Sequence, residues 1–247
     1  MNTRMKTLVV GAAAGAGLIL SAGTACGSTI VYNQPVNPSL SGGTYFFSFE
    51  RPNGSGIETA DRFSLSTATT VEALGWAGAW AVYDAAQPVQ NITGWKVRFY
   101  TASADGSNPA FLAAPLIELS ISDVPSTALG TTHIFPDTLS EQHFGYSADL
   151  PDFTLPAGNY FLSVQAILRI DQQSAANTQL SSLFLWDHST PNVDDLCAVR
   201  DIGAIPWSPA AGDRAFTIIG TQVPGPATAA TVFVGTGLML RRRRTVA

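Results

Sequence analysis

The chain has 247 residues, of which 46% are hydrophobic and only 13% are charged, a balance that excludes charge-driven disorder and leaves room for one large domain. Its 22 glycines and 15 prolines are too few for a collagen-like or low-complexity chain, but they predict many turns. All 18 acidic residues lie between Ser28 and Gln222 with only seven of the basic ones, which gives this part a net charge of −11 and excludes nucleic acid as a partner.

The first 27 residues have the layout of a secretory signal peptide. Two basic residues, Arg4 and Lys6, precede an apolar or small-residue run from Leu8 to Leu20, and further small residues follow it. A helix of 13 residues spans about 20 Å, which is short of the roughly 30 Å hydrocarbon core of a bilayer. We therefore expect a signal helix that is cleaved near Ala25 or Gly27, and export of the remaining chain.

The two cysteines depend on where that cleavage falls. If the mature chain keeps Cys26, a bridge to Cys197 can form in an oxidising compartment, whereas cleavage after Cys26 leaves Cys197 alone. The carboxylates of Asp194, Asp195 and Asp201 lie close to Cys197 in sequence and would raise the pKa of its thiol. We expect Cys197 to be a buried structural residue rather than a nucleophile.

Residues 28–222 are predicted to form one all-β domain, an antiparallel β-sandwich of jelly-roll type. Trp95, Val97 and Phe99 alternate with Lys96 and Arg98, as in a strand with one buried face. Short alternating runs of this kind recur between turn residues every 8 to 15 positions. The expected strands are Thr29–Asn33, Thr44–Phe49, Arg62–Ser66, Thr70–Trp80, Trp95–Tyr100, Leu116–Ser122, Asn159–Ile170, Ser182–Trp186 and Ala215–Thr221.

Two further patterns define this domain. No stretch of a dozen residues has a helical period, which excludes a βαβ nucleotide-binding plan and favours antiparallel sheets packed face to face. No linker-like run or internal repeat divides residues 28–222, so a single domain is expected. Its predicted core contains the apolar faces of the two clearest strands, namely Trp95, Val97, Phe99, Tyr160, Leu162 and Val164.

No residue pattern in the domain predicts catalysis, a metal or a cofactor. The three histidines, His133, His143 and His188, lack the close spacing of a zinc site, and no G-x-S-x-G nucleophile elbow is present. Five carboxylates are candidates for a glycosidase pair, but they are expected to be solvated loop residues. They are Asp149, Asp152, Asp187, Asp194 and Asp195. Three of them, Asp187, Asp194 and Asp195, could also bind calcium, although the spacing of an EF-hand loop is absent.

Trp76 and Trp80 are candidates for stacking against sugar rings. They are four residues apart on one predicted strand, so both rings lie on the same face. Exposed flat aromatic rings bind the faces of pyranose sugars, whereas buried tryptophans contribute to the core. The sequence leaves both interpretations open.

Residues 223–247 differ in composition from both the first 27 residues and the predicted domain. Val223-Pro224-Gly225-Pro226 is followed by an apolar or small-residue run from Ala229 to Leu240 and then by the four arginines Arg241, Arg242, Arg243 and Arg244. This order resembles the PEP-CTERM sorting tail of exported bacterial proteins, with Gly225 at the place of the usual glutamate. The resemblance implies processing by an exosortase-type transpeptidase. On physical grounds, a short apolar helix is expected in the membrane, with the arginine cluster as its cytoplasmic stop.

Three functions follow in order of preference. The first is an exported, non-enzymatic protein of the cell surface or extracellular matrix. Its expected partners are the export machinery, an exosortase-type transpeptidase, the membrane during transit and an extracellular polysaccharide. The second is a carbohydrate-binding module, and the third is a secreted hydrolase.

Overall fold

The computed structural model describes residues 28–37, 46–82, 92–109, 114–135, 139–169, 183–189, 196–202 and 206–223. Within these residues every helix-or-strand element is a β-strand, which confirms the all-β prediction. The expected signal helix and the apolar C-terminal helix lie outside them. None of the described segments forms a helix long and apolar enough to cross a membrane.

The first of two sheets is organised around the 14-residue strand β5, Thr69–Val82. Strands β14 and β11 pair with successive parts of one edge of β5, and β9 pairs with the other edge. All pairings in this sheet are antiparallel. Its other strands are β1 (Thr29–Gln34), β2 (Phe46–Phe47), β8 (Ser126–Phe135), β9 (Leu139–Leu155), β11 (Phe184–Trp186) and β14 (Phe216–Gln222).

The second sheet is organised around β10, Gly158–Leu168, which pairs with β4 on one side and β6 on the other. Near one end of β10 the short strand β3 lies between β10 and β4, parallel to β10 and antiparallel to β4. The other pairings of this sheet are antiparallel. Its remaining strands are β3 (Phe49–Glu50), β4 (Gly56–Leu65), β6 (Ile92–Thr101), β7 (Ile117–Ile121), β12 (Cys197–Asp201) and β13 (Ser208–Ala210).

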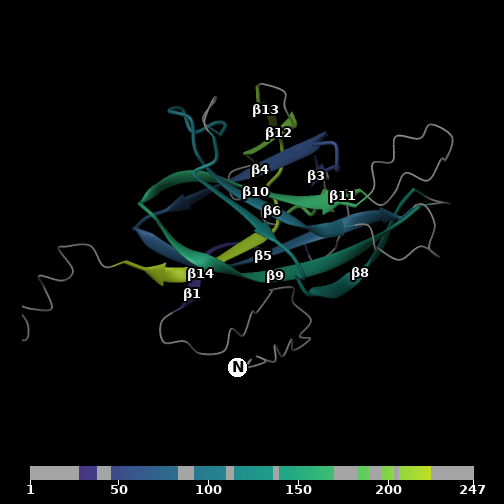
Figure 1. The fold of residues 1–247 in the computed structure, drawn as a ribbon, viewed down its shortest axis with the longest axis horizontal. Coiled ribbons are helices and arrows are strands. Elements are labelled where there is room, and N and C mark those ends of the chain that lie inside the picture. Colours follow the sequence, from purple (N-terminus) through teal and green to yellow (C-terminus); the bar gives the residue numbers. More distant parts are fainter. Residues whose placement is uncertain are drawn as a thin grey trace, which may run out of the picture.

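The two sheets pack face to face around an aromatic core (Figure 1). The ring of Trp95 on β6 lies 5.1 Å from that of Trp76 on β5 and 4.6 Å from that of Tyr146 on β9, centroid to centroid. Edge-to-face and tilted contacts of this kind add to the free energy of apolar burial. The predicted core is confirmed: its six residues, Trp95, Val97, Phe99, Tyr160, Leu162 and Val164, are each at most 5% exposed.

The longest strand, β9, was not predicted. Its segment contains Pro151 and two aspartates, which are uncommon inside strands. The register shifts at this point, because Val71 pairs with Phe153 while Ala73 pairs with Asp149, so that three residues of β9 lie opposite the single residue between them. A bulge of this kind removes Pro151 from the hydrogen-bonded ladder and lets the strand continue past it.

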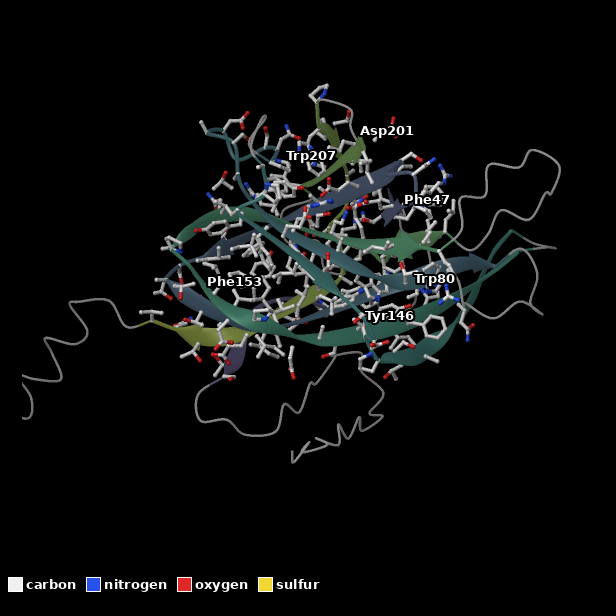
Figure 2. The ribbon with its side chains drawn as sticks, in the orientation of Figure 1. Phe47, Trp80, Tyr146, Phe153, Asp201 and Trp207 are labelled. Atoms are coloured by element: carbon white, nitrogen blue, oxygen red, sulfur yellow. The ribbon has the colours of Figure 1, made fainter. Side chains whose placement is uncertain are left out.

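Trp76 and Trp80 face the core, and the sugar-stacking interpretation of these two residues is wrong for this fold. Both side chains have no exposed surface. The indole Nε1–H of Trp80 donates a 2.7 Å hydrogen bond to the hydroxyl of Tyr146 in the interior, where Figure 2 shows both residues between the sheets. Their even spacing does place them on one face of β5, but that face packs against the second sheet.

Candidate functional site

The outer side of the second sheet carries a connected network of long polar side chains, which we call the polar face. Strand alternation produces it, because Trp95, Val97 and Phe99 of β6 point into the core and the residues between them point outward. Its members come from six strands. They are Glu50 on β3, Glu58 on β4, Lys96, Arg98 and Tyr100 on β6, Glu118 on β7, Gln165 on β10 and Arg200 on β12.

Glu58 is the centre of the polar face. Its side chain is only 1% exposed, and its carboxylate accepts four hydrogen bonds. Arg98 Nη1 and the Tyr100 hydroxyl donate to Oε1 over 3.0 and 2.7 Å, and Arg200 donates to Oε2 from Nε and Nη2 over 2.9 and 2.6 Å. A buried carboxylate is stable only with such partners. Donors on two other strands, β6 and β12, therefore occupy both oxygens of the Glu58 carboxyl group.

Arg98 links Glu58 to the exposed side of the network. Its Nε donates to Glu118 Oε2 over 2.7 Å, its Nη1 also donates to Gln165 Oε1, and its Nη2 lies 3.6 Å from a carboxylate oxygen of Glu50. Burial alone would lower the pKa of Arg98, but Glu58 and Glu118 raise it overall. In return, the hydrogen bond from Arg98 lowers the pKa of Glu118. The guanidinium is thus permanently charged and fixed in orientation.

An aromatic platform supports Arg200 at the other side of Glu58. The guanidinium carbon of Arg200 lies 4.3 Å from the centroid of the Trp207 ring, and that ring meets Tyr100 edge-on at 5.6 Å. Trp207, Tyr100, Ala60, Phe161 and Ala198 form a small apolar cluster outside the main core. Figure 2 places Trp207 near β12, away from Trp80 and Tyr146. Cation–π contact and burial together restrict the rotamers of Arg200.

One buried hydroxyl on this face, that of Ser163, makes no hydrogen bond with any described residue. Ser163 of β10 is paired with Arg98 and Ala60 in the flanking strands, and it lies two residues from Gln165 on the same side of the strand. Its hydroxyl is buried and has no hydrogen-bond partner among the described residues. An unsatisfied buried hydroxyl costs about 1–3 kcal/mol. On the polar face, Ser163 is therefore a buried side chain whose hydroxyl could still take a hydrogen-bond partner.

A second set of buried polar groups links segments of the first sheet to residues 187–189. The expectation that Asp187 is a solvated loop residue is wrong. Asp187 is 2% exposed, and its two carboxylate oxygens both lie 3.0 Å from Nδ1 of the fully buried His143. His188 Nε2 lies 2.7 Å from the amide nitrogen of Asn37. Burial, followed by the charge of Arg214, lowers the pKa of His188. The Asn37 amide therefore donates its hydrogen bond to Nε2 of the neutral His188 imidazole.

Arg214 and Asp61 anchor the neighbouring strands within the same buried set. Both side chains are fully buried. The Asp61 carboxyl accepts hydrogen bonds from the backbone N–H groups of Arg214 and Arg62 over 2.6 and 2.9 Å. The guanidinium of Arg214 donates to the carbonyl of Gly212 and to that of Trp186. These bonds fix the chain that enters β14, which is a structural role.

Cys197 is buried, as expected, although its surroundings differ from those predicted. Burial raises the pKa of its thiol to about 12, and Asp61 and Asp213 contribute in the same direction. These are residues that the fold brings close, not the sequence neighbours Asp194 and Asp195, which lie outside the described residues. A thiol with this pKa is inert at neutral pH.

The other predicted site residues are placed only in part. Val223 ends the described chain and is 39% exposed, while Pro224, Gly225, Pro226 and the four arginines of residues 241–244 lie outside the described residues. Asp149 and Asp152 are exposed on β9. Among the residues that the structure describes, no group of three or more His, Cys, Asp or Glu side chains could hold a metal ion.

Sequence reasoning missed the polar face as a site. It placed Lys96 and Arg98 on the face of their strand opposite the core, which is correct, but Glu58 and Gln165, the partners of Arg98, lie on strands far away in sequence. The feature of the sequence that could have indicated this site was the pair of cations Lys96 and Arg98 in a chain with only 13% charged residues. No protein-family model, curated protein or solved structure matches this chain.

Proposed function

We propose that the chain is an exported, non-enzymatic protein of the bacterial cell surface or extracellular matrix, delivered by residues 1–27 and processed at residues 223–247. The observation that carries this proposal is the position of the two ends of the domain. Thr29 at the start of β1 pairs with Gly220 near the end of β14. The hydroxyls of Ser28 and Thr221 both donate to the carboxylate of Glu72.

This arrangement suits a domain that carries a targeting signal at each end. Because β1 and β14 are antiparallel neighbours, the leader and the tail join the domain at the same end of the first sheet. Strand β14 is also paired on both sides, with β1 and with β5. A tail that tethers the protein would therefore pull on a strand held by two ladders of hydrogen bonds rather than on a free edge.

The chemistry of the buried polar groups supports a role without catalysis. Glu58 is saturated by four donors, and His143 is fully buried against Asp187. Burial raises the pKa of the Cys197 thiol to about 12. A nucleophile or general acid needs an accessible group whose pKa is near the working pH. These groups instead stabilise the fold.

The strand order supports the jelly-roll form of the sandwich. Taken along the chain, the eight principal strands are β1, β4, β5, β6, β7, β9, β10 and β14. In the sheets they have the orders β1-β14-β5-β9 and β4-β10-β6-β7. The order of these eight strands matches that of two interleaved Greek keys, and this match supports the jelly-roll form.

Carbohydrate binding is the second candidate, and the polar face is the observation that favours it. The buried rings of Trp76 and Trp80 do not take part. The side chains of the polar face are instead held in fixed orientations on strands, with Glu118, Arg200, Glu50 and Lys96 partly exposed. Binding sites built on rigid elements keep their geometry better than sites on loops.

Cell fractionation of the native host tests the first proposal. The mature protein is expected in the surface or extracellular fraction without residues 1–27. Replacing all four arginines by serine (Arg241→Ser to Arg244→Ser) removes the cytoplasmic stop, because each arginine costs about 2.5–3.5 kcal/mol at the bilayer centre. The full-length tail should then reach the medium. A cytoplasmic wild-type protein, or hydrolysis of any member of a glycosidase and esterase substrate panel, would contradict the proposal.

A further inference from the structure

We propose that the polar face binds a neutral polysaccharide through the hydroxyl groups of the sugars. The proposal rests on the proposed function, since it names the ligand class of an exported matrix protein, and it assigns that ligand to specific residues. The four most accessible side chains of the face are 46% (Glu118), 24% (Arg200), 18% (Glu50) and 16% (Lys96) exposed. They surround a buried centre formed by Glu58, Arg98 and Gln165.

The pattern of donors and acceptors suits sugar hydroxyls. A hydroxyl group both donates and accepts hydrogen bonds. On the polar face, carboxylate acceptors alternate with guanidinium and ammonium donors: Glu118 bonds to Arg98, and Lys96 bonds to Glu50. Neighbouring hydroxyls of a sugar ring can therefore each find a donor and an acceptor on nearby strands of this sheet.

The charge of the face selects a neutral ligand. Each of its three cations, Lys96, Arg98 and Arg200, is paired with a carboxylate of the same face, and the numbers of cationic and anionic side chains are equal. The surrounding chain between Ser28 and Gln222 has a net charge of −11. An acidic polysaccharide would meet repulsion from this field and would have to displace existing ion pairs.

The face is organised before a ligand arrives. Arg98 is fixed by Glu58, Glu118 and Gln165, and Arg200 is fixed by Glu58 and by the ring of Trp207. Side chains that are already ordered lose little rotamer entropy on binding. Trp207 is 7% exposed, so we assign it as a positioning residue for Arg200 and not as a stacking surface.

The same contacts favour binding over cleavage. Glycoside hydrolysis needs one carboxylic acid with a raised pKa beside a second, ionised carboxylate. Four donors already occupy both oxygens of Glu58, and the hydrogen bond from Arg98 lowers the pKa of Glu118. Neither group is suited to donate a proton to a leaving oxygen. A bound glycan should be recovered intact.

Isothermal titration calorimetry on the full chain tests the proposal. The neutral probes are hexasaccharides of β-1,4-glucan, β-1,3-glucan, xylan, mannan and α-1,4-glucan, and the anionic probes are oligomers of galacturonate and alginate. Two variants change the accessible part of the face, Glu118→Gln and Lys96→Gln. The matched control for Glu118→Gln is Glu72→Gln, which removes the same charge from a carboxylate on β5 of the first sheet, away from the polar face. Thermal unfolding shows whether each variant is folded.

We expect at least one neutral hexasaccharide to bind to the wild-type chain and to Glu72→Gln with the same affinity. Each variant of the polar face should bind it at least tenfold more weakly, because a hydrogen bond to a charged group is lost. The proposal is overturned if no neutral probe binds, if only the anionic probes bind, or if the variants of the face bind as tightly as the control. None of these outcomes alters the fractionation result, so the proposed export and tail processing are tested separately.

Discussion

Replacement of Glu58 by glutamine probes the centre of the polar face. Glutamine has the shape of glutamate, so its Oε1 can still accept from Arg98 and Tyr100. Its amide nitrogen, however, takes the place of the oxygen that accepts two hydrogen bonds from Arg200, and a donor then faces two donors. Removing one partner of a buried ion pair costs about 3–5 kcal/mol. Because the Arg200 side chain is 24% exposed and can turn towards water, we expect the lower end, about 3 kcal/mol.

This loss is a large part of the total, since domains are stable by about 5–15 kcal/mol. Urea unfolding, analysed by linear extrapolation, gives the change in free energy of unfolding. The matched control is Glu118→Gln, whose carboxylate is 46% exposed and whose ion pair with Arg98 should contribute at most about 1 kcal/mol. Equal losses for Glu58→Gln and Glu118→Gln would refute the assignment of Glu58 as the buried centre. In the Glu58→Gln background, Arg200→Gln should cost less than in the wild type.

Three further changes test other parts of the structure. Gly78→Ala should destabilise the domain by about 1–3 kcal/mol, because its Cβ would lie 2.1 Å from Cε2 of the Phe184 ring; an unchanged thermal midpoint would contradict this packing. Ser163→Ala should raise the free energy of unfolding, by up to about 1–3 kcal/mol, since it removes a buried hydroxyl without a partner, and a loss above about 1 kcal/mol would show that the hydroxyl has one. Burial and the charge of Arg214 lower the pKa of His188, so the unfolded chain binds the proton first and stability should fall as the pH drops below about 6.5. His188→Gln should make that fall shallower in urea titrations at pH 7.5, 6.0 and 5.0, and identical slopes would disprove it.

Elements with one buried and one outward face could be predicted from the sequence. The alternation of apolar and polar side chains identified β6, β10 and the six core residues. Successive side chains of a strand point to opposite faces, so the apolar set shows which face is buried. Strand β9 could not be found in this way. Its Pro151 lies in a bulge opposite β5, and only the partner strand shows that the ladder resumes after it.

The candidate site was less predictable because its contacts join distant parts of the chain. The bond between Arg98 and Glu58 spans 40 residues, and that between His143 and Asp187 spans 44. Local patterns place a side chain on one side of a strand, but the order of strands in the sheet decides which side chains meet. The sequence predicted correctly that Trp76 and Trp80 share one face of their strand. That this face belongs to the core depends on the second sheet, which packs against it and leaves both residues without exposed surface.

The most direct test of the central claim is the intact mass of the mature protein isolated from its native host. Export and tail processing predict an N-terminus after the signal peptide, near residue 26 or 28, and a C-terminus near Pro226 without the arginine cluster. A chain that still begins at Met1 would contradict export. A membrane-bound chain that ends at Ala247 would contradict processing and show that the tail, with Gly225 in place of glutamate, acts as a simple anchor.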